Sequence, residues 1–369
     1  MGSKTVLLAG GGTGGHLYPG VAVASALTKL RPDVKPLFLC TNRPIDATIL
    51  EPTGFAFTRQ PIVPPTKSVG GLLRYFKSWR ETREQIRGLR RELQPAAILG
   101  LGGYAAEPAV RYFAERKVPA LMLNPDVIPG KANQFLFKKV TQICCQFEAT
   151  RQHLPAAQQS KMVVTGCPIR DDLINLPPRA EACQRLGLNA KMMTLTITGA
   201  SQGAQTVNEA TLTSLKAIKL QGWNILHLAG KEHAEKVRAE YREAEIPAAV
   251  LDFTPAMHDV WAVTDLTVSR SGASTCAELT ACGIAGVLMP YPFHKDMHQR
   301  ANAQVLADAG AAVLLDDQKD RKKNSERLTP ILQSLLYDAT KRTSMAAAAK
   351  ALGRPDAAEA VAKLLADVI

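Results

Sequence analysis

Short apolar runs alternate with amphipathic stretches along the first half of the chain. The first run, residues 5–9, ends in a cluster of glycines, and residues 19–30 then have the pattern of a helix. Further apolar runs of the length of buried strands occupy residues 34–40, 96–99, 119–124 and 142–147. Helical patterns lie between several of these runs, and this alternation predicts a parallel sheet covered by helices on both faces.

The same series begins again in the second half of the chain. Residues 191–198 form an apolar run that is followed by another glycine-rich loop. Further strand candidates follow at residues 225–228, 248–253, 266–269, 286–289 and 311–315. We therefore predict an α/β protein with two Rossmann-like domains. The expected domains are residues 1–165 and 166–343, with the C-terminal helix 344–369 packing back on the first domain.

Length and composition agree with this organisation. A chain of 369 residues, 46% hydrophobic and only 5% aromatic, suits two domains with aliphatic cores. The seven cysteines are odd in number and match no zinc or disulfide framework, which favours reduced thiols in the cytoplasm. The N-terminus does not have the pattern of a signal peptide, and no apolar run approaches the roughly 18–20 residues of a membrane span.

The positive charge is concentrated in one segment. The net charge is +12. Residues 67–91 hold eight Lys or Arg and two Glu, so this segment alone carries half of the net charge. There, Leu72, Leu73, Phe76 and Trp79 are interleaved with Arg74, Lys77 and Arg80. The segment is either a patch that binds an anionic membrane surface or an ordinary amphipathic helix with a buried apolar face. Nucleic acid would be a rival partner, but the sequence holds no recognition motif for it.

Three glycine-rich loops follow predicted strands, at residues 10–16, 100–104 and 199–204. Glycines allow the backbone to approach a ligand closely, and the free amides at a helix start favour phosphate. The first loop also fits G-x-G-x-x-G, but the next strand ends in Thr41-Asn42 without an acid for a ribose, which argues against a dehydrogenase. One such loop can be merely a tight turn. Three at the ends of parallel strands predict a ligand-binding crevice.

A fourth segment, residues 269–279, begins at a strand end and enters a helix. Its small residues Ser271, Gly272 and Ala273 would present amides to phosphate, and Glu278 could accept the hydroxyls of a ribose. The alternative is a capping region with an exposed Glu. His298 and Gln299 follow as candidate sugar contacts. His298 and Asp296 could suggest a metal site, but no other His, Asp or Glu stands at a ligand spacing from them, so no metal site is predicted.

In their order and spacing, these segments resemble the MurG family, the N-acetylglucosaminyltransferases of bacterial cell-wall synthesis in glycosyltransferase family 28. The resemblance rests on Gly11 to His16 with Pro19-Gly20, on Gly102-Gly103-Tyr104, on Ser201 to Ala204 and on Arg270 to Glu278. It implies a glycosyltransferase B fold with the active site in a cleft between the domains. It also implies inverting transfer from UDP-N-acetylglucosamine to lipid I, the undecaprenyl-diphosphate-linked N-acetylmuramyl pentapeptide, giving lipid II. Such an enzyme would lie at the cytoplasmic face of the inner membrane and serve peptidoglycan synthesis.

The resemblance also implies roles for particular residues. His16 is the expected catalytic base, with Asp126 as its rival. Expected donor contacts are Thr13, Gly14, Gly15, Arg170, Ser201, Gln202, Gly203, Thr254, Arg270, Ser271, Gly272, Ala273, Glu278, His298 and Gln299. Expected acceptor contacts are Gly12, Gly14, Gly15, Gly102, Gly103 and Tyr104. Among the donor contacts, Arg170 and Ser201 would stabilise the leaving diphosphate, Thr254 would read the uracil and Glu278 the ribose.

Three positions depart from the family pattern. Asp126 stands where an asparagine is expected, and Cys167 replaces another. Glu107 occupies a loop that usually carries a small or apolar residue, where it would repel a diphosphate unless it pairs with Arg111. All three bear on the acceptor more than on the donor.

Other functions stay open at this stage. A transferase of the same fold could use another acceptor, and a UDP-N-acetylglucosamine 2-epimerase could share the two domains. A third interpretation is a subunit that binds a nucleotide sugar without catalysis. The presence of His16 and Glu278 argues against it. No cofactor is expected, and no metal is required if backbone amides and arginine suffice to stabilise the leaving group.

Overall fold

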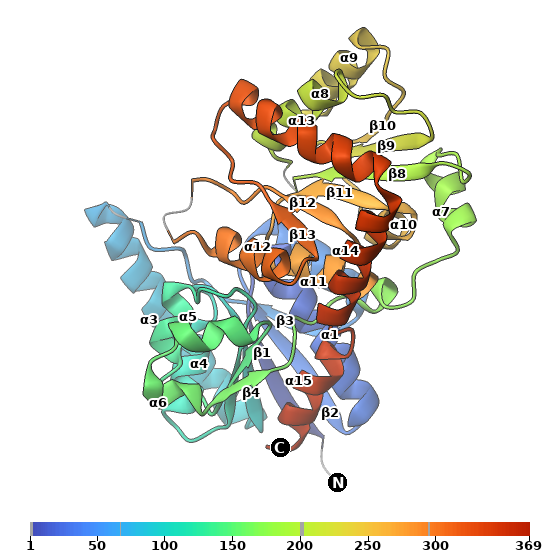
Figure 1. Ribbon diagram of the computed structural model, residues 1–369. Helices are drawn as coiled ribbons and strands as arrows, with labels where there is room; N and C mark the ends of the chain where they lie inside the picture. The colour runs from blue at the N-terminus through green and yellow to red at the C-terminus, as the bar shows by residue number, and fades with distance from the viewer. Residues whose placement is uncertain (1–2, 67, 200–202, 294–295) are drawn as a thin grey trace. The chain divides into compact units, whose positions relative to one another are not determined.

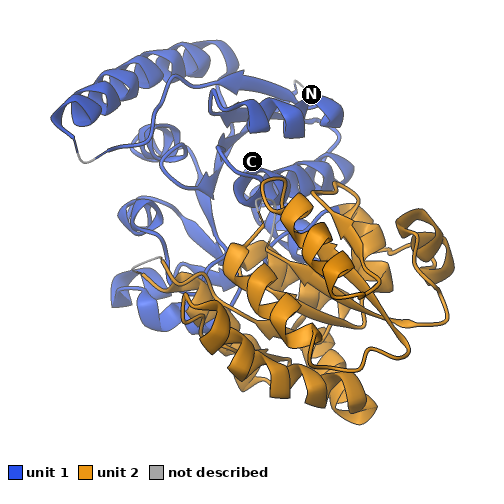
Figure 2. Ribbon diagram, turned by 90° about the horizontal axis from the view of Figure 1, so that it is seen from above, with its two compact units in different colours: residues 1–170, 354–369 blue, residues 171–353 orange. Residues whose placement is uncertain are grey.

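The computed structural model describes residues 3–66, 68–199, 203–293 and 296–369 (Figure 1). The chain divides into two compact units, Met1–Arg170 with Arg354–Ile369 and Asp171–Gly353 (Figure 2). The division after Arg170 lies five residues beyond the expected one. The segment that returns to the first unit is also shorter than the expected 344–369, because Met345 packs into the core of the second unit.

The first unit contains a seven-stranded sheet whose paired strands are all parallel. Its order is β3-β2-β1-β4-β5-β6-β7, so the chain leaves β1 toward one edge and resumes at β4 toward the other. The strands are β1 (Lys4–Gly10), β2 (Val34–Cys40), β3 (Ala56–Arg59), β4 (Ala97–Gly102), β5 (Ala120–Asn124), β6 (Gln142–Cys145) and β7 (Met162–Val164). Because of this switch, the loops after β1 and β4 lie side by side at the carboxyl end of the sheet.

Alternating side chains of β1 point to the two faces of this sheet. Val6 and Leu8 pack with α1 and α15, whereas Leu7 and Ala9 pack with α3, α4 and α5. The helices of this unit are α1 (Gly14–Leu30), α2 (Pro44–Leu50), α3 (Val69–Leu93), α4 (Glu107–Ala114), α5 (Lys131–Leu136), α6 (Ala156–Gln159) and α15 (Ala357–Ala366), with 3-10 turns η1 (Glu51–Thr53) and η2 (Glu148–His153). Helix α1 starts at Gly14 rather than at the expected Pro19, which lies inside it.

The second unit repeats this plan with six strands in the order β10-β9-β8-β11-β12-β13, again all parallel. They are β8 (Met193–Thr198), β9 (Trp223–Leu228), β10 (Ala249–Leu251), β11 (Leu266–Ser269), β12 (Gly286–Leu288) and β13 (Ala312–Leu314). Here β8 and β11 flank the switch, so Gly199 after β8 and the start of the 269–279 segment lie together at the carboxyl end of the sheet.

Helices cover both faces of the second sheet as well. They are α7 (Arg179–Leu186), α8 (Gln205–Leu215), α9 (Ala234–Glu243), α10 (Met257–Val263), α11 (Ala273–Cys282), α12 (His298–Asp308), α13 (Arg321–Tyr337) and α14 (Ala339–Leu352), with the 3-10 turn η3 (Asp171–Leu173). Leu195, Ile197 and Val268 pack in the core shared with α8 and α13. Within the described ranges, no helix combines the length and the apolar character needed to cross a bilayer.

Candidate functional site

In the first unit, the imidazole of His16 lies against the second glycine loop. Added Cβ atoms at Gly102 and Gly103 would come within 3.2 Å of Cδ2 and 3.0 Å of Cε1 of this ring. Both glycines have positive φ angles, of 107° and 73°. The expected sites Gly102 and Gly103 are therefore brought together with His16, and any side chain there would displace the ring.

The protonation state of His16 follows from its hydrogen bonds. Its Nδ1 lies 3.3 Å from the Gly11 carbonyl oxygen and 3.2 Å from the Thr13 hydroxyl. A carbonyl oxygen can only accept, so Nδ1 carries the proton and the lone pair resides on Nε2. Burial lowers the pKa of His16, opposed by the Gly11 bond and by the charges of Asp126 and Asp46. The side chain is thus neutral near pH 7 and able to accept a proton.

Asp46, which the sequence analysis did not single out, holds the first glycine loop. Its carboxylate accepts the Gly12 N–H at 2.7 and 3.0 Å, and the Thr41 N–H and hydroxyl at 2.7 Å each. The expected acceptor contact of Gly12 therefore does not use this N–H, which is already donated within the protein. The remaining loop residues Gly14 and Gly15, at the start of α1, are at least partly exposed.

The mouth of this loop also carries Arg43 and Tyr104. Arg43 donates through Nη1 to the Gly12 carbonyl at 2.7 Å, and its side chain is exposed. The Tyr104 hydroxyl lies 3.6 Å from the position of a Cβ on Gly12. Burial raises the pKa of Tyr104, so it stays a hydrogen-bond donor at neutral pH.

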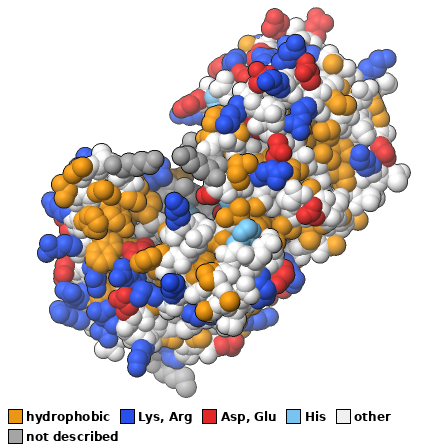
Figure 3. Space-filling model, turned by 60° about the vertical axis from the view of Figure 1, so that its left-hand side comes forward, with side chains coloured by type: hydrophobic (Ala, Val, Ile, Leu, Met, Phe, Trp, Pro, Cys, Tyr) orange, Lys and Arg blue, Asp and Glu red, His pale blue; other side chains and the backbone are white. Residues whose placement is uncertain are grey.

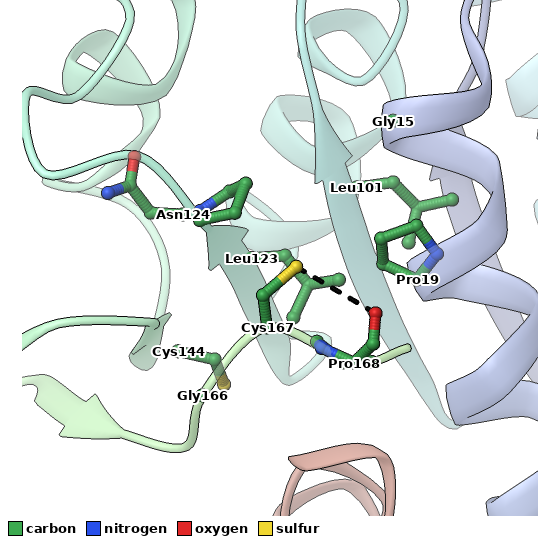
Figure 4. A pocket seen from close by; sticks show the side chains of 10 residues that line it. Gly15, Pro19, Leu101, Leu123, Asn124, Cys144, Gly166, Cys167 and Pro168 are labelled. Atoms are coloured by element: carbon green, nitrogen blue, oxygen red, sulfur yellow. Dashed lines mark hydrogen bonds between the residues drawn. The ribbon is translucent and has the colours of Figure 1, made fainter. Parts of the chain in front are cut away.

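A small pocket opens beside α1 in the same unit (Figure 4). Gly15 and Pro19 of α1, Asn124 of β5 and Cys167 are among the residues that line it. Asn124 donates to the Asp126 carbonyl at 2.8 Å and accepts from Asn133 at 3.1 Å, which orders the turn that carries Asp126. The Cys167 thiol contacts the Pro168 carbonyl at 3.8 Å. Two of the departing positions, Asp126 and Cys167, therefore belong to this corner of the unit.

Glu107, the third departure, is buried and paired. It accepts the indole N–H of Trp79 at 2.6 Å and lies 3.5 Å from the guanidinium of Arg111, as expected. Trp79 is half-buried by this contact. Its indole joins α3 to α4, so Trp79 differs from its apolar neighbours on α3.

Those neighbours form an exposed apolar surface at the start of α3. Val69, Leu72, Leu73 and Phe76 expose 77%, 42%, 67% and 60% of their surface. We call these four residues the α3 patch. Figure 3 shows hydrophobic side chains gathered on this part of the molecule with Lys and Arg around them. Arg74, Lys77 and Arg80 are the exposed basic residues on the same stretch of helix.

Arg170 ends the first of the two segments that make up the first unit. Its guanidinium lies 5.1 Å from the ring centroid of Tyr18 on α1, a cation–π distance. Both side chains are half-buried.

In the second unit, a pocket of about 320 Å³ lies where the loops after β8 and β11 meet. Its lining includes Gly199, Gly203, Gly272, Tyr291 and Gln299. Gly203 has φ +74°, and a Cβ there would lie 2.0 Å from the Ala229 carbonyl oxygen, so only glycine fits. This volume falls within the usual range for small-molecule sites. The expected contacts Ser201 and Gln202 lie outside the described residues.

Arg270 also lines this pocket, but its guanidinium is engaged with the protein. Nη1 donates to the carbonyls of Met289 and Pro290 and to Asp317 at 2.8 Å, and Nη2 donates to Thr206. Burial lowers the pKa of Arg270. The expected donor contact is thus primarily a buried structural ion pair.

Ser271 is likewise turned into the protein. It is fully buried, and its hydroxyl donates to the Gln299 carbonyl at 2.9 Å. This bond ties the start of α11 to α12, and the expected donor contact of Ser271 stays a prediction for its backbone amide.

Gly272 is the N-cap of α11, and no side chain caps this helix start. Ala273, the first residue of the helix, is partly exposed. One turn further, the half-buried Glu278 accepts the indole N–H of Trp261 at 2.8 Å. A carboxylate held in this way beyond a helix start suits the ribose of a nucleotide whose phosphates lie at the helix start.

The remaining expected residues have specific partners. The Thr254 hydroxyl accepts the Ala256 N–H at 3.1 Å, which shapes the turn after β10. The Gln299 side chain accepts the Tyr291 N–H at 3.0 Å. His298 Nδ1 lies 2.7 Å from a carboxylate oxygen of Asp296. Among the described residues, no group of three or more His, Cys, Asp or Glu is arranged to hold a metal.

Comparison with known proteins identifies the family. Residues 6–145 match the glycosyltransferase family 28 N-terminal domain and residues 194–361 match the glycosyltransferase family 28 C-terminal domain. A relative from Bacillus licheniformis is 31% identical over 367 residues, covering 98% of this chain and 97% of the relative. The chain belongs to glycosyltransferase family 28. That relative is named as the UDP-N-acetylglucosamine–N-acetylmuramyl-(pentapeptide) pyrophosphoryl-undecaprenol N-acetylglucosamine transferase.

Solved structures agree with this membership. The crystal structure of Acinetobacter baumannii MurG, a member of the family, is 27% identical, with a TM-score of 0.74 and 99% of each chain covered. A UDP-GlcNAc 2-epimerase from Neisseria meningitidis reaches a TM-score of 0.69 over 98% of this chain and 100% of its own. It is only 12% identical, so its likeness shows the fold alone. The glycosyltransferase B fold and the MurG resemblance of the sequence are thereby confirmed.

Proposed function

We propose that this chain transfers N-acetylglucosamine from UDP-N-acetylglucosamine to lipid I, giving lipid II with inversion at the sugar's anomeric carbon. The 31% identity, over nearly the whole chain, to a relative named as this transferase supports the activity over the epimerase and the non-catalytic subunit. The observation that carries the chemistry is the neutral His16, whose Nδ1 is tied to Gly11 while its ring rests on Gly102 and Gly103.

In the reaction, the acceptor hydroxyl oxygen attacks C1 of the donor sugar, and the bond from C1 to the β-phosphate oxygen breaks. The hydroxyl proton passes to Nε2 of His16, and UDP leaves with the bonding pair. His16 is proposed as the base because its lone pair lies on the nitrogen that is not bonded to the loop. Asp126 is the nearby carboxylate that stabilises the imidazolium once it forms.

On the donor side, the pocket of the second unit is the proposed site for the UDP moiety. The start of α11 at Gly272 and Ala273 would stabilise the diphosphate, and Glu278, oriented by Trp261, would accept the ribose hydroxyls. Arg170, Gly203, Thr254, His298 and Gln299 stay proposed contacts of the donor. Arg270 enters the proposal as a support of the pocket wall, through Asp317 and Thr206.

On the acceptor side, the two glycine loops with Tyr104 are the proposed site for the lipid-linked diphosphate. The α3 patch and its basic neighbours would bind an anionic inner-membrane surface, where each Lys or Arg near the lipid contributes about 1 kcal/mol. Such a position suits an acceptor that stays in the bilayer.

The test is a radiolabelled transfer assay with UDP-N-acetylglucosamine and a short-chain lipid I analogue. Wild type, His16→Ala and Glu278→Ala are compared, and equilibrium binding of UDP is measured for each. We expect label in the lipid product, a loss of at least about 100-fold in kcat for His16→Ala with UDP binding kept, and weakened UDP binding for Glu278→Ala. Formation of UDP-N-acetylmannosamine without lipid labelling would instead establish the epimerase.

A further inference from the structure

Asp46 is a buried carboxylate in the first unit that the proposed chemistry does not use. Its side chain lies on α2 and is fully buried. Four hydrogen bonds from Gly12 and Thr41 surround the two carboxylate oxygens. Desolvating a charged carboxylate is costly, and this set of donors compensates for the lost water.

A single peptide group connects Asp46 to His16. The Gly12 N–H that Asp46 accepts and the Gly11 carbonyl that holds His16 Nδ1 belong to the same peptide unit. A trans peptide directs its N–H and its C=O to opposite sides, and the described chain holds no cis bond. Asp46 and His16 therefore form hydrogen bonds on opposite sides of this peptide group.

The close packing at Gly11 makes this arrangement specific. A Cβ at Gly11 would lie 2.3 Å from Oδ2 of Asp46, and the φ angle of Gly11 is +156°. Hydrogen bonds in a chain polarise one another, so a carboxylate at the N–H end makes the Gly11 carbonyl a stronger acceptor. A carbonyl oriented in this way keeps the proton of His16 on Nδ1.

We propose that Asp46 is a positioning residue of the transfer reaction, which acts on His16 through the Gly11–Gly12 peptide and keeps the lone pair of the imidazole on Nε2. This inference rests on the proposed role of His16 as base. It adds a residue that contacts neither substrate and that lies 34 positions from the loop it orients.

The electrostatic surroundings point the same way. The charges of Asp46 and Asp126 raise the pKa of His16 against the larger effect of burial, which lowers it. Arg43 is a cation bonded to the Gly12 carbonyl of this loop, and Tyr104 places its hydroxyl nearby. Removing the charge of Asp46 leaves Asp126 as the remaining carboxylate that favours the imidazolium.

The test compares Asp46→Asn, His16→Ala and the double variant in the full-length chain. An asparagine keeps the shape but has one acceptor oxygen, and its NH₂ faces groups that themselves donate. We expect kcat to fall roughly 10- to 100-fold in Asp46→Asn with UDP binding unchanged. In the His16→Ala background, the same change should cost less than about twofold, because its effect passes through His16.

A second readout needs no substrate. NMR titration of ¹⁵N-labelled histidine should give a lower His16 pKa in Asp46→Asn than in wild type and a larger share of the Nε2–H tautomer. An unchanged His16 titration, or losses that multiply in the double variant, would overturn the proposal. If Asp46→Asn does not fold by circular dichroism, Thr41→Val removes one bond to the carboxylate and should shift the tautomer in the same direction. Absence of transfer by the wild type would count against the proposed function, while the titration still decides the role of Asp46.

Discussion

Arg270 and Asp317 form an ion pair of 2.8 Å whose side chains are 7% and 0% exposed. The guanidinium also donates to two carbonyls and Thr206, and the carboxylate accepts from Asn324 and the Lys319 N–H. Burial would raise the pKa of Asp317, but the bonds from Thr206, Asn324, Lys319 and Arg270 together lower it. The pair therefore stays ionised and braces one wall of the pocket in the second unit.

Asp317→Asn should destabilise the second unit by about 3–5 kcal/mol, because it leaves a buried guanidinium without its counter-charge. The neighbouring pair Arg300–Asp316, at 2.9 Å but about 40% exposed, gives the matched control. Asp316→Asn should change the stability by less than about 1 kcal/mol. Urea unfolding followed by tryptophan fluorescence measures both, and equal effects would mean that Arg270 is held by its other acceptors alone.

Gly103→Ala should lower kcat by displacing His16, in addition to its cost in stability. Gly103 and Gly54 have nearly the same φ, 73° and 72°, but nothing lies within 4 Å of a Cβ at Gly54. Both alanine variants should lose about 1–2 kcal/mol of stability through the left-handed backbone. Only Gly103→Ala should lose activity. Thermal melts of the two variants measure the loss of stability, and the transfer assay measures the loss of activity. Full activity of Gly103→Ala would show that the His16 ring can move without consequence.

The α3 patch and Trp79 should respond differently to substitution. Leu73→Ser and Phe76→Ser remove exposed apolar surface, so both should weaken binding to vesicles with anionic lipid while leaving the melting temperature nearly unchanged. Trp79→Phe should leave vesicle binding intact but cost about 1–3 kcal/mol of stability, because the buried Glu107 loses the indole N–H donor. Co-sedimentation with vesicles of graded anionic content tests this, and equal loss of binding in all three variants would refute the distinction.

His227 should make the second unit sensitive to acid. Burial lowers its pKa to about 3, and its two ring nitrogens bond to Tyr241 at 2.9 Å and Asn208 at 3.1 Å. Between the ordinary value of 6.5 and about 3, the unfolded chain binds a proton at this site that the folded chain does not. The stabilisation is therefore complete above pH 6.5 and is lost as the pH falls toward 3.

The measurement is the free energy of unfolding in urea at pH 7 and at pH 4.5. The slope contributed by His227 approaches about 1.4 kcal/mol per pH unit. His227→Gln should remove that contribution, so its stability should fall less on acidification than that of wild type. Identical pH dependence of the two proteins would contradict the assignment.

The fold could be predicted from the sequence because most strands are largely buried and rich in apolar residues. The two strands that the pattern did not reveal, β3 and β7, lie at the edges of the first sheet and have four and three residues. In β3 every residue is at least partly exposed, so neither alternation nor a long apolar run marks it.

The candidate site was predictable only as far as it is local in sequence. The glycine loops and the helix start at Gly272 can be recognised from the residues of one short segment. Asp46 does not, because its partner Gly12 is 34 residues away. The resemblance implied a donor contact for Arg270, but it could not reveal the ion pair with Asp317, which stands 47 residues later. Such pairings arise from tertiary packing, which no local pattern encodes.

The return of the last helix to the first unit has a consequence for biosynthesis. Val361, Ala362 and Leu365 of α15 pack in one core with Val6 and Leu17. A ribosome completes the contiguous second unit before it adds α15, so the nascent first unit carries an uncovered apolar face throughout that time. The unit that is translated first therefore cannot complete its core until α15 has been added, and before then its apolar face needs protection from aggregation.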